Sequence, residues 1–471
     1  MTRIFGTADA AAWAKGRLYG PDLPLCRTWR HDSREVESGD AFVALSGENT
    51  DGHLYVMNAI ERGAQVVLVD EARYEQLGLS TQAFAGLSVI TAANAETALA
   101  QIAQEYLRQT APKVVGITGS VGKTTTRELT VAVLKEKYRV HSAVRSFNTV
   151  LGCSLTILAM PTDSEILILE LGTNHFGEIS KMVELFPPDF CVITEIAPAH
   201  LEGFGTIEGV LRAKMEICES KKAKILAYNS DNAALKKEVS YKCNNFKMMD
   251  LGQNSEAELR IENIETRLTD TGAKIKVTYR WKGKAIDFEA ALFGSQHAWT
   301  IGYAVAIGKY FGVSDRDMKN AISQLKPLAG RGALKRTGRG AWVIDEAYNA
   351  NPSSMKAALE NVARLTAPQQ HKCFAVLGGM RELGKNTKEL HEDLLPLLSC
   401  FDHVIVYGEE WNGIKLPENA EQCEGIECVI QNALAFDADD NTLILIKGSN
   451  SYGLKQIVAL LTEVADVHNI R

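Results

Sequence analysis

Short, continuous runs of apolar residues alternate with helical patterns along the middle of the chain. Four such runs lie within the segments Lys113–Gly119, Glu165–Gly172, Asp189–Ile196 and Lys224–Asn229. Because a strand that is covered on both faces has no polar side, runs of this kind are typical of parallel sheets between helices. The pattern therefore predicts an α/β domain with a mainly parallel sheet over residues 111–327.

The pattern changes on either side of this region. Before it, strand, turn and helix patterns follow one another from Thr28 to Asp70, and an amphipathic helix over 94–112 ends at a proline. After Gly340, four further apolar runs separated by helical patterns predict another α/β unit. We therefore expect three domains, comprising residues 1–110, 111–327 and 328–471.

Two further elements are expected inside the middle domain. Residues Gly272–Leu292 alternate in polarity around a Trp-Lys-Gly-Lys turn, which predicts a β-hairpin. A helical pattern covers Gln296–Phe311, and a glycine-containing linker leads from there to the last domain.

Composition and charge narrow the class of protein. The length of 471 residues fits two to four domains, and 46% apolar with 23% charged residues is typical of a well-buried protein. The net charge is −7 with no long basic run, which disfavours nucleic acid or an anionic membrane as the main partner. The start of the sequence has no apolar core of signal-peptide length, and no apolar stretch of the chain is long enough to span a membrane. We therefore expect a cytoplasmic enzyme without membrane insertion.

The nine cysteines are scattered along the chain. The nearest pair, Cys423 and Cys428, has a spacing that suits zinc poorly and no histidine companion. We therefore expect reduced thiols.

The segment VVGITGSVGKTTTRELT, which begins at Val114, predicts a phosphate-binding loop between a strand and a helix. It departs from the strict pattern G-x-x-x-x-G-K-[ST], because isoleucine stands where the first glycine is expected; the alternative is a glycine-rich turn that binds nothing. Gly119 and Gly122 still let backbone N–H groups turn toward phosphate oxygens. Lys123 is suited to span the β- and γ-phosphates, and the Thr124 hydroxyl to bind Mg²⁺. The predicted nucleotide-binding residues are Gly119, Ser120, Val121, Gly122, Lys123, Thr124 and Thr125.

The spacing G-x-x-G-x-x-G-K-T-T resembles that of the Mur ligase family, ATP-dependent enzymes that form peptide bonds in bacterial cell-wall synthesis. Further blocks resemble the family in order along nearly the whole chain: RHDSREVESGDAFVALSGENTDGH from Arg30, ILELGTNHFGEI from Ile168, EIAPAHLEGFGTIEGVLRAKMEI from Glu195, GRGALKR from Gly330, VIDEAYNANPSSM from Val343, AVLGGMRELG from Ala375 and LIKGSNS from Leu445. The resemblance implies three α/β domains: a small UDP-binding domain, a central P-loop ATPase domain and a Rossmann-like carboxy-terminal domain.

The block DEAYNANPSSM further resembles the family member that adds D-alanyl-D-alanine to UDP-N-acetylmuramoyl-tripeptide. The implied reaction converts the terminal carboxylate of the tripeptide into an acyl phosphate with ATP, and the amine of the dipeptide then displaces phosphate. Phosphoryl transfer needs positioning and positive charge more than covalent help from the protein. The implied ligands are these two substrates, ATP and two Mg²⁺ ions, and we expect a monomer that binds no nucleic acid.

The matched positions imply roles for individual residues. Catalytic roles fall on Lys123, Glu170, His200, Lys214 and Arg331. The implied Mg²⁺ ligands are Thr124, Glu170, His200 and Lys214, the lysine as a carbamate. Besides the phosphate loop, ATP would contact Arg331, Asp345, Tyr348 and Asn349. The UDP-sugar peptide would contact Ser33, Arg34, Ser46, Asn148, Asn174 and His175.

Taken alone, several of these residues have ordinary structural interpretations. His200 would be a capping or core histidine, and Lys214 a solvated lysine on a helix surface. His175 is equally consistent with a loop histidine that touches nothing, and Ser46 and Gly47 with turn residues.

Four family blocks are altered in this chain. The replaced positions are Ser146 and Thr149 for asparagines after the phosphate-loop helix, Ala298 for an adenine-side asparagine, Gly379 for an aspartate and Asn450 for an arginine. A related ligase with another acceptor is therefore an alternative. A nucleotide-switched binding module is disfavoured, because the chain has no Asn-Lys-x-Asp loop to read guanine.

Overall fold

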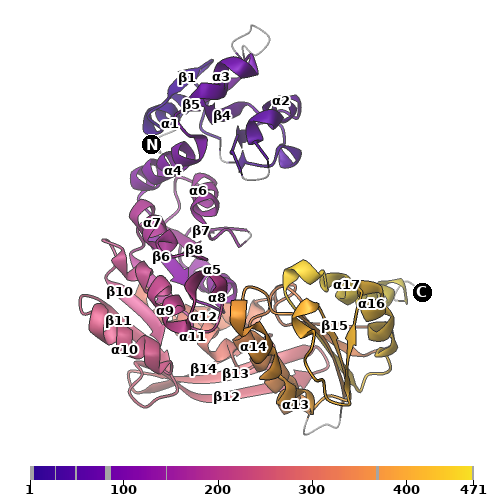
Figure 1. The fold of residues 1–471 in the computed structure, drawn as a ribbon. Helices are drawn as coiled ribbons and strands as arrows, with labels where there is room; N and C mark the ends of the chain where they lie inside the picture. The colour runs from indigo at the N-terminus through magenta and orange to yellow at the C-terminus, as the bar shows by residue number, and fades with distance from the viewer. Residues whose placement is uncertain are drawn as a thin grey trace.

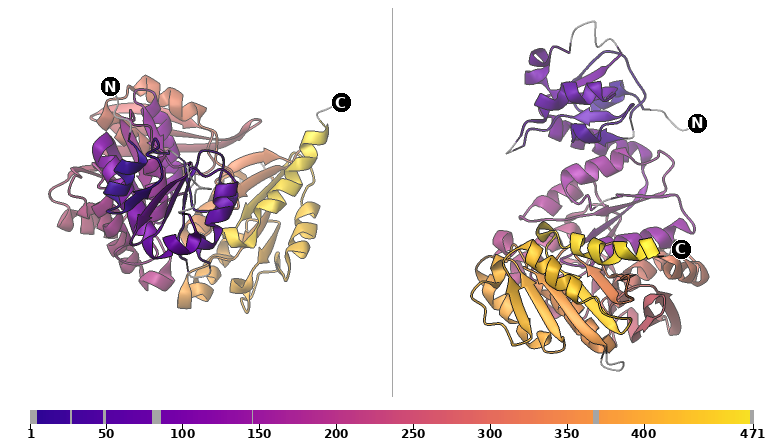
Figure 2. Two further views of the ribbon diagram at one scale, coloured as in Figure 1. Left: turned by 90° about the horizontal axis from the view of Figure 1, so that it is seen from above. Right: turned by 90° about the vertical axis from the view of Figure 1, so that its right-hand side faces the viewer.

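The computed structural model of the protein describes residues 5–26, 28–47, 50–79, 86–144, 146–366 and 371–468. Three sheets with helices around them follow one another along the chain and form three α/β domains, which confirms the expected fold class (Figure 1). The amino-terminal domain stands above the central domain, and the carboxy-terminal domain lies beside the central one (Figures 1 and 2). In the part of the chain that the structure describes, no helix is long and apolar enough to cross a membrane.

The amino-terminal domain has a five-stranded sheet in the order β1-β5-β4-β3-β2, parallel except where β1 meets β5. Its strands are β1 (Arg17–Tyr19), β2 (Trp29–Arg30), β3 (Ala41–Val43), β4 (Val66–Asp70) and β5 (Ser88–Ala92). Its helices are α1 (Thr7–Trp13), α2 (Val56–Glu61), α3 (Glu71–Tyr74) and α4 (Ala95–Thr110). Helix α4 packs on α1 and also on α6 (Val150–Leu158) of the next domain, so it joins the two domains.

The central domain has a nine-stranded sheet in the order β14-β13-β12-β11-β10-β9-β6-β8-β7. Its strands are β6 (Lys113–Thr118), β7 (Val140–Ser142), β8 (Ile166–Glu170), β9 (Phe190–Ile193), β10 (Ile225–Asn229), β11 (Lys247–Gly252), β12 (Leu259–Thr269), β13 (Gly272–Trp281) and β14 (Lys284–Ala290). The pairs from β7 to β12 are parallel, and β12, β13 and β14 form an antiparallel extension.

Helices cover both faces of the central sheet. Besides α6, they are α5 (Lys123–Lys135), α7 (Glu178–Leu185), α8 (Leu201–Phe204), α9 (Ile207–Met215), α10 (Ala233–Lys242), α11 (His297–Phe311) and α12 (Asp315–Gln324). Successive side chains of a strand point to opposite faces. In β8, Ile166 and Ile168 pack in the core with α5 and α11, whereas Leu167 and Leu169 pack with α6 and α7. This burial on both sides explains the uninterrupted apolar runs.

The carboxy-terminal domain has a six-stranded sheet in the order β15-β16-β20-β17-β18-β19, parallel except for the β15–β16 pair. Its strands are β15 (Ala333–Arg336), β16 (Trp342–Glu346), β17 (Lys372–Gly378), β18 (His403–Tyr407), β19 (Ala420–Cys423) and β20 (Thr442–Lys447). Its helices are α13 (Pro352–Thr366), α14 (Thr387–Glu392), α15 (Leu395–Leu398), α16 (Ile426–Ala435) and α17 (Lys455–His468).

The hairpin predicted over 272–292 and the helix predicted over 296–311 are confirmed by β13, β14 and α11. The pattern did not reveal β12, because a register shift between Ile261 and Asn263 interrupts its alternation. The expectation of reduced thiols is wrong for Cys423 and Cys428, which form a disulfide. Cys423 lies at the end of β19 and Cys428 in the first turn of α16, and their Cα atoms are 5.8 Å apart.

Polar contacts join the carboxy-terminal domain to the central one. Asn361 of α13 accepts hydrogen bonds from the N–H and the hydroxyl of Ser295, at 3.0 and 3.1 Å. The same side chain donates to Oε1 of Gln296 at 2.6 Å. At a second point, Tyr348 donates to Oγ of Ser146 at 3.2 Å. The two domains are therefore held by directional contacts between side chains.

Asn361→Ala should destabilise this contact. The side chain is buried, and its removal leaves the N–H of Ser295 without a partner. The Ser295 hydroxyl loses its acceptor and keeps only the hydrogen bond that it accepts from Arg364. We expect the free energy of unfolding, measured by chemical denaturation, to fall by about 1–3 kcal/mol. Arg364→Ala is the matched control, because this exposed side chain gives Ser295 a single hydrogen bond and should cost less than about 1 kcal/mol. Equal losses in the two variants would contradict the prediction.

Candidate active site

The central sheet brings polar groups to the carboxyl ends of three adjacent strands. β6 leads into the glycine-rich loop, β8 ends at Glu170, and Thr194 follows β9. The three strands lie side by side in the order β9-β6-β8 and are parallel. Groups that follow them therefore meet at one edge of the sheet, where α/β proteins bind their ligands.

The loop after β6 needs glycine at two positions. Gly119 has a φ of +142°, and a Cβ atom there would lie 2.0 Å from Oγ1 of Thr194. Gly122 has a φ of +85° and directly precedes α5. The hydroxyl of Thr194 donates to the carbonyl of Val121 at 2.6 Å, which ties the loop to the neighbouring strand. The loop therefore presents backbone groups and the amino-terminal end of α5 to an anion.

Two cationic side chains from different domains influence each other at this loop. Nζ of Lys123 donates to the carbonyl of Gly119 at 2.7 Å. The guanidinium of Arg331 lies over the ring of Tyr348, 4.1 Å from its centre. Burial lowers the pKa of Lys123, the negative charge of Glu170 raises it, and the positive charge of Arg331 lowers it. A bound polyanion would therefore be attracted by both cations and would offset their repulsion.

A cavity of about 870 Å³ opens at this edge and reaches from the central domain to the carboxy-terminal domain. Its size is that of a site for a small molecule or cofactor. The predicted site residues that line it are Ser120, Val121, Gly122, Lys123, Thr124, Thr125, Asn148, Glu170, His200, Arg331, Tyr348 and Asn349. The structure thus brings most of the predicted nucleotide and metal residues together.

Glu170 is held between two polar neighbours from α5. Its Oε2 accepts a hydrogen bond from the Thr124 hydroxyl at 3.3 Å, and its Oε1 lies 3.1 Å from Nη1 of Arg127. The side chains of Glu170 and Arg127 are only 1% and 2% exposed. The sequence reasoning did not single out Arg127.

His200 lies at the boundary between two domains. It precedes α8 with a φ of +52°, and its ring pairs with the carboxylate of Glu382, whose own φ is +64°. Burial lowers the pKa of His200, the carboxylate of Glu382 raises it, and the positive charge of Lys214 lowers it. Two non-glycine residues in the left-handed region therefore meet here, and such conformations persist only where surrounding contacts impose them.

Lys214 of α9 is 1% exposed, so its interpretation as a solvated surface lysine is wrong. It does not line the cavity, and its side chain has no hydrogen bond or ion pair with another described residue. Burial lowers the pKa of Lys214 well below its ordinary value, and the positive charge of Lys123 lowers it further. Its amine is therefore biased toward the neutral, nucleophilic form.

Asp345 is buried at the end of β16 and does not line the cavity. Its carboxylate accepts hydrogen bonds from the N–H of Gly330 at 2.9 Å and of Ala347 at 3.3 Å. These bonds fix the linker immediately before Arg331. The arrangement gives Asp345 a positioning role, and its expected contact with ribose stays a prediction.

Asn174 and His175 also lie outside the cavity lining. Their N–H groups donate to Oε2 of Glu178 at 2.7 and 3.1 Å, and the His175 side chain is 74% exposed. Ser33 and Arg34 lie in the amino-terminal domain, away from this cavity, and Arg34 pairs with a neighbouring aspartate. The contacts of these four residues with substrate stay predictions.

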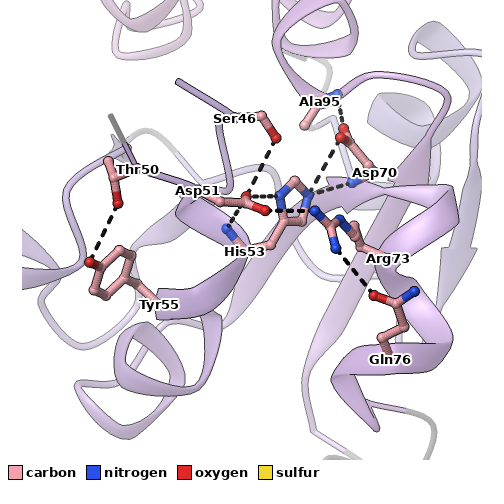
Figure 3. A network of polar contacts seen from close by, with 9 residues as sticks. All are labelled: Ser46, Thr50, Asp51, His53, Tyr55, Asp70, Arg73, Gln76 and Ala95. Atoms are coloured by element: carbon pink, nitrogen blue, oxygen red, sulfur yellow. Dashed lines mark hydrogen bonds and ion pairs between the residues drawn. The ribbon is translucent and has the colours of Figure 1, made fainter. Parts of the chain in front are cut away.

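Ser46 belongs to a polar network around His53 in the amino-terminal domain (Figure 3). Its hydroxyl donates to Asp51 at 3.4 Å, and the same carboxylate is bound by Nδ1 of His53 at 2.7 Å and by Arg73 at 2.9 Å. The N–H of Asp70 donates to Nε2 of His53 at 3.0 Å, which places the proton of a neutral ring on Nδ1. The network ties Ser46 to the end of β4, and the expected contact of Ser46 with the UDP-sugar peptide stays a prediction.

Sequence reasoning missed several residues of the cavity. Thr194, Glu195 and Asn229 line it, and each ends or follows a predicted strand, which is the signal that could have revealed them. Trp299, which also lines it, donates to Oδ1 of Asn229 at 3.1 Å and directly follows the altered position Ala298. Ala298 is fully buried and does not line the cavity.

A phosphate loop, a buried carboxylate beside it and an arginine from a second domain define a P-loop nucleotide-binding protein of three α/β domains. Family models match in the same order: the Mur ligase family catalytic domain over 29–110, the Mur ligase middle domain over 117–307 and the Mur ligase glutamate ligase domain over 330–450. The UDP-N-acetylmuramoyl-tripeptide–D-alanyl-D-alanine ligase of Bacillus subtilis (strain 168) is 32% identical over 97% of this chain and 98% of its own length. The chain belongs to the Mur ligase family, as its motifs predicted.

Solved structures have the same fold over nearly the whole chain. MurF from Acinetobacter baumannii has a TM-score of 0.82 at 24% identity and covers 98% of this chain and 99% of its own. MurF ligase from Thermotoga maritima, solved in complex with ADP, has a TM-score of 0.79 at 26% identity and covers 94% of this chain and 99% of its own.

Gly119→Ala should impair nucleotide binding, because its Cβ would collide with Thr194 and displace the loop. We expect the affinity for a fluorescent ATP analogue to fall by about tenfold or more, which corresponds to about 1.4 kcal/mol. Gly413→Ala is the matched control, since Gly413 also has a positive φ, +72°, but a Cβ there meets nothing within 4 Å. A loss of affinity in the control, or none at Gly119, would contradict the prediction.

Proposed function

We propose that this protein is an ATP-dependent ligase that joins D-alanyl-D-alanine to UDP-N-acetylmuramoyl-tripeptide and releases ADP and phosphate. The observation that carries the proposal is the convergence of Lys123, Glu170 and Arg331 on one cavity between two domains. The Bacillus subtilis relative, which bears the name of this reaction, matches nearly the whole chain. The ADP complex of the Thermotoga maritima protein supports the use of ATP.

The chemistry explains why these charges are needed. An amine does not displace oxide from a carboxylate at a useful rate. Transfer of the γ-phosphoryl group of ATP to the carboxylate gives ADP and an acyl phosphate. The amine then attacks the carbonyl carbon, the bond to phosphate breaks, and the amine loses a proton. Lys123 and Arg331 supply positive charge beside the phosphoryl group in transfer.

The residues present fit Mg²⁺, which prefers oxygen ligands and usually binds one or two carboxylates together with substrate phosphates. The Thr124 hydroxyl and the Glu170 carboxylate are adjacent in the cavity. Among the described residues, no group of three or more His, Cys, Asp or Glu could hold a metal ion alone, so phosphate oxygens would complete the site. When bound, the ion neutralises phosphate charge. A second ion at His200 would compete with Glu382 for the ring.

We propose that Lys214 acts as a carbamate. Its neutral Nζ would attack the carbon of CO₂, so that an N–C bond forms while one C–O π bond breaks. Loss of a proton from the nitrogen then leaves an anion with two oxygens in place of the neutral amine. The burial of this amine and its lack of any polar partner among the described residues support the assignment. The resulting anion would complement the positive charge of Lys123, which acts on this site.

The three domains divide the work in this proposal. Residues 1–110 bind the UDP-sugar, residues 111–327 bind ATP, and residues 328–471 bind the dipeptide and part of ATP. Because the cavity lies between the second and third domains, closure of the third domain would assemble the site and exclude water. We place the reaction in the cytoplasm, where ATP is available, and expect a monomer.

Phosphate release tests the ligase assignment directly. Purified protein with ATP and Mg²⁺ should release phosphate only when both the UDP-muramoyl tripeptide and D-alanyl-D-alanine are present. A coupled phosphate assay with each component omitted in turn measures this dependence. Release without either substrate would indicate a nucleotide-switched protein, and release with a different acceptor would indicate a related ligase.

Lys214→Ala should lower turnover by about 10–100-fold or more, the range found when groups supporting a metal site are removed. Bicarbonate should not restore activity, whereas short carboxylic acids should restore part of it, since they replace the lost anion. Lys222→Ala is the control, because Lys222 is an exposed lysine of the same domain. Full activity of Lys214→Ala would contradict the carbamate.

A further inference from the structure

Arg127 is a buried cation of the phosphate-loop helix that the proposed mechanism does not use. It lies in α5, three and four residues after Thr124 and Lys123, so the three residues share one face of the helix. Thr124 and Lys123 line the cavity, but Arg127 does not. Its guanidinium is therefore placed behind the groups that would meet the nucleotide.

The two oxygens of Glu170 have different neighbours. Oε1 faces Nη1 of Arg127 at 3.1 Å, and Oε2 faces the hydroxyl of Thr124 at 3.3 Å. The guanidinium is in turn held by Glu128, whose carboxylate accepts a hydrogen bond from Nε at 3.1 Å. Because Arg127 and Glu170 are almost completely buried, water cannot easily substitute for either partner. Oε1 of Glu170 has no hydrogen bond with another described residue, so its polar contact is the ion pair with Arg127.

We propose that Arg127 is a positioning residue that holds Oε1 of Glu170, so that Oε2 and the Thr124 hydroxyl are the oxygens offered to the cation of the bound nucleotide. The inference rests on the proposed function, in which Thr124 and Glu170 bind Mg²⁺. Partners that orient a metal ligand typically change metal affinity by about 10–100-fold when they are removed.

A purely electrostatic role for Arg127 predicts the opposite sign. Arg127 carries a positive charge close to the cation site, so its removal would relieve repulsion and tighten cation binding. A positioning role predicts that the cation binds more weakly when Arg127 is removed, because the Glu170 carboxylate is no longer held in one orientation. The direction of the change therefore separates the two roles.

The test measures the binding of Mn²⁺, which is a spectroscopic substitute for Mg²⁺. The electron paramagnetic resonance signal of free Mn²⁺ is titrated in the presence of saturating ADP with the wild-type protein, Arg127→Met and Arg127→Lys. We expect the half-saturating Mn²⁺ concentration to rise about tenfold or more in Arg127→Met. Arg127→Lys keeps the charge but lacks the planar fork, so it should also bind Mn²⁺ more weakly. ADP binding in the presence of EDTA should change less than about twofold.

Lys135→Met is the matched control, because it removes an exposed cation from the last turn of the same helix. Its affinity for Mn²⁺ should equal that of the wild type. Wild-type or tighter Mn²⁺ binding by Arg127→Met would overturn the inference. Should Arg127→Met fail to fold, wild-type Mn²⁺ affinity in Arg127→Lys would overturn it equally.

Failure of this inference can be distinguished from failure of the proposed function. Ligase activity of the wild-type protein is measured separately with both substrates. The expected contrast in Mn²⁺ binding without ligase activity would support the inference and overturn the proposed reaction. An active ligase whose Arg127 variants bind Mn²⁺ normally would overturn the inference alone.

Discussion

The backbone at Gly119 passes so close to the side chain of Thr194 that no Cβ fits between them. This contact determines where β6 ends and where α5 begins, and it therefore determines where Lys123 and Thr124 stand. Because Thr194 also binds the carbonyl of Val121, the loop is fastened to the adjacent strand before any ligand arrives. Such preorganisation spares the protein the cost of ordering the loop at the moment of binding.

The carboxy-terminal domain contributes a second cation, Arg331, to the site beside the loop. Asp345 holds the N–H of Gly330 from the end of a buried strand, and this fixes the chain just before Arg331. The arginine is thus positioned by a sheet of the carboxy-terminal domain, while the lysine is positioned by a sheet of the central domain. How well the two cations stabilise a charge that develops between them depends on how the two sheets are held relative to each other. Asn361 makes part of the contact between the two domains.

Most of the fold could be predicted from the sequence because burial on both faces leaves continuous apolar runs, as in β6, β8, β9 and β10. The phosphate loop could be predicted because its chemistry lies within one short segment. Contacts between distant segments could not be predicted, because no local sequence pattern reports them. Examples are the contact of Arg127 with Glu170 and that of Asn361 with Ser295, which form only in the folded chain. The burial of Lys214 was hidden for the same reason.

Helix α4 ends the amino-terminal domain, yet it packs on α6 of the next domain, and the hydroxyl of Tyr106 donates a buried hydrogen bond to the carbonyl of Met160 at 2.6 Å. A chimaera that exchanged the first 110 residues for those of another ligase would combine two surfaces that did not evolve together. A unit that keeps both contacts extends from the first domain through α6 to Met160, so it is larger than a division of the chain at its linkers suggests.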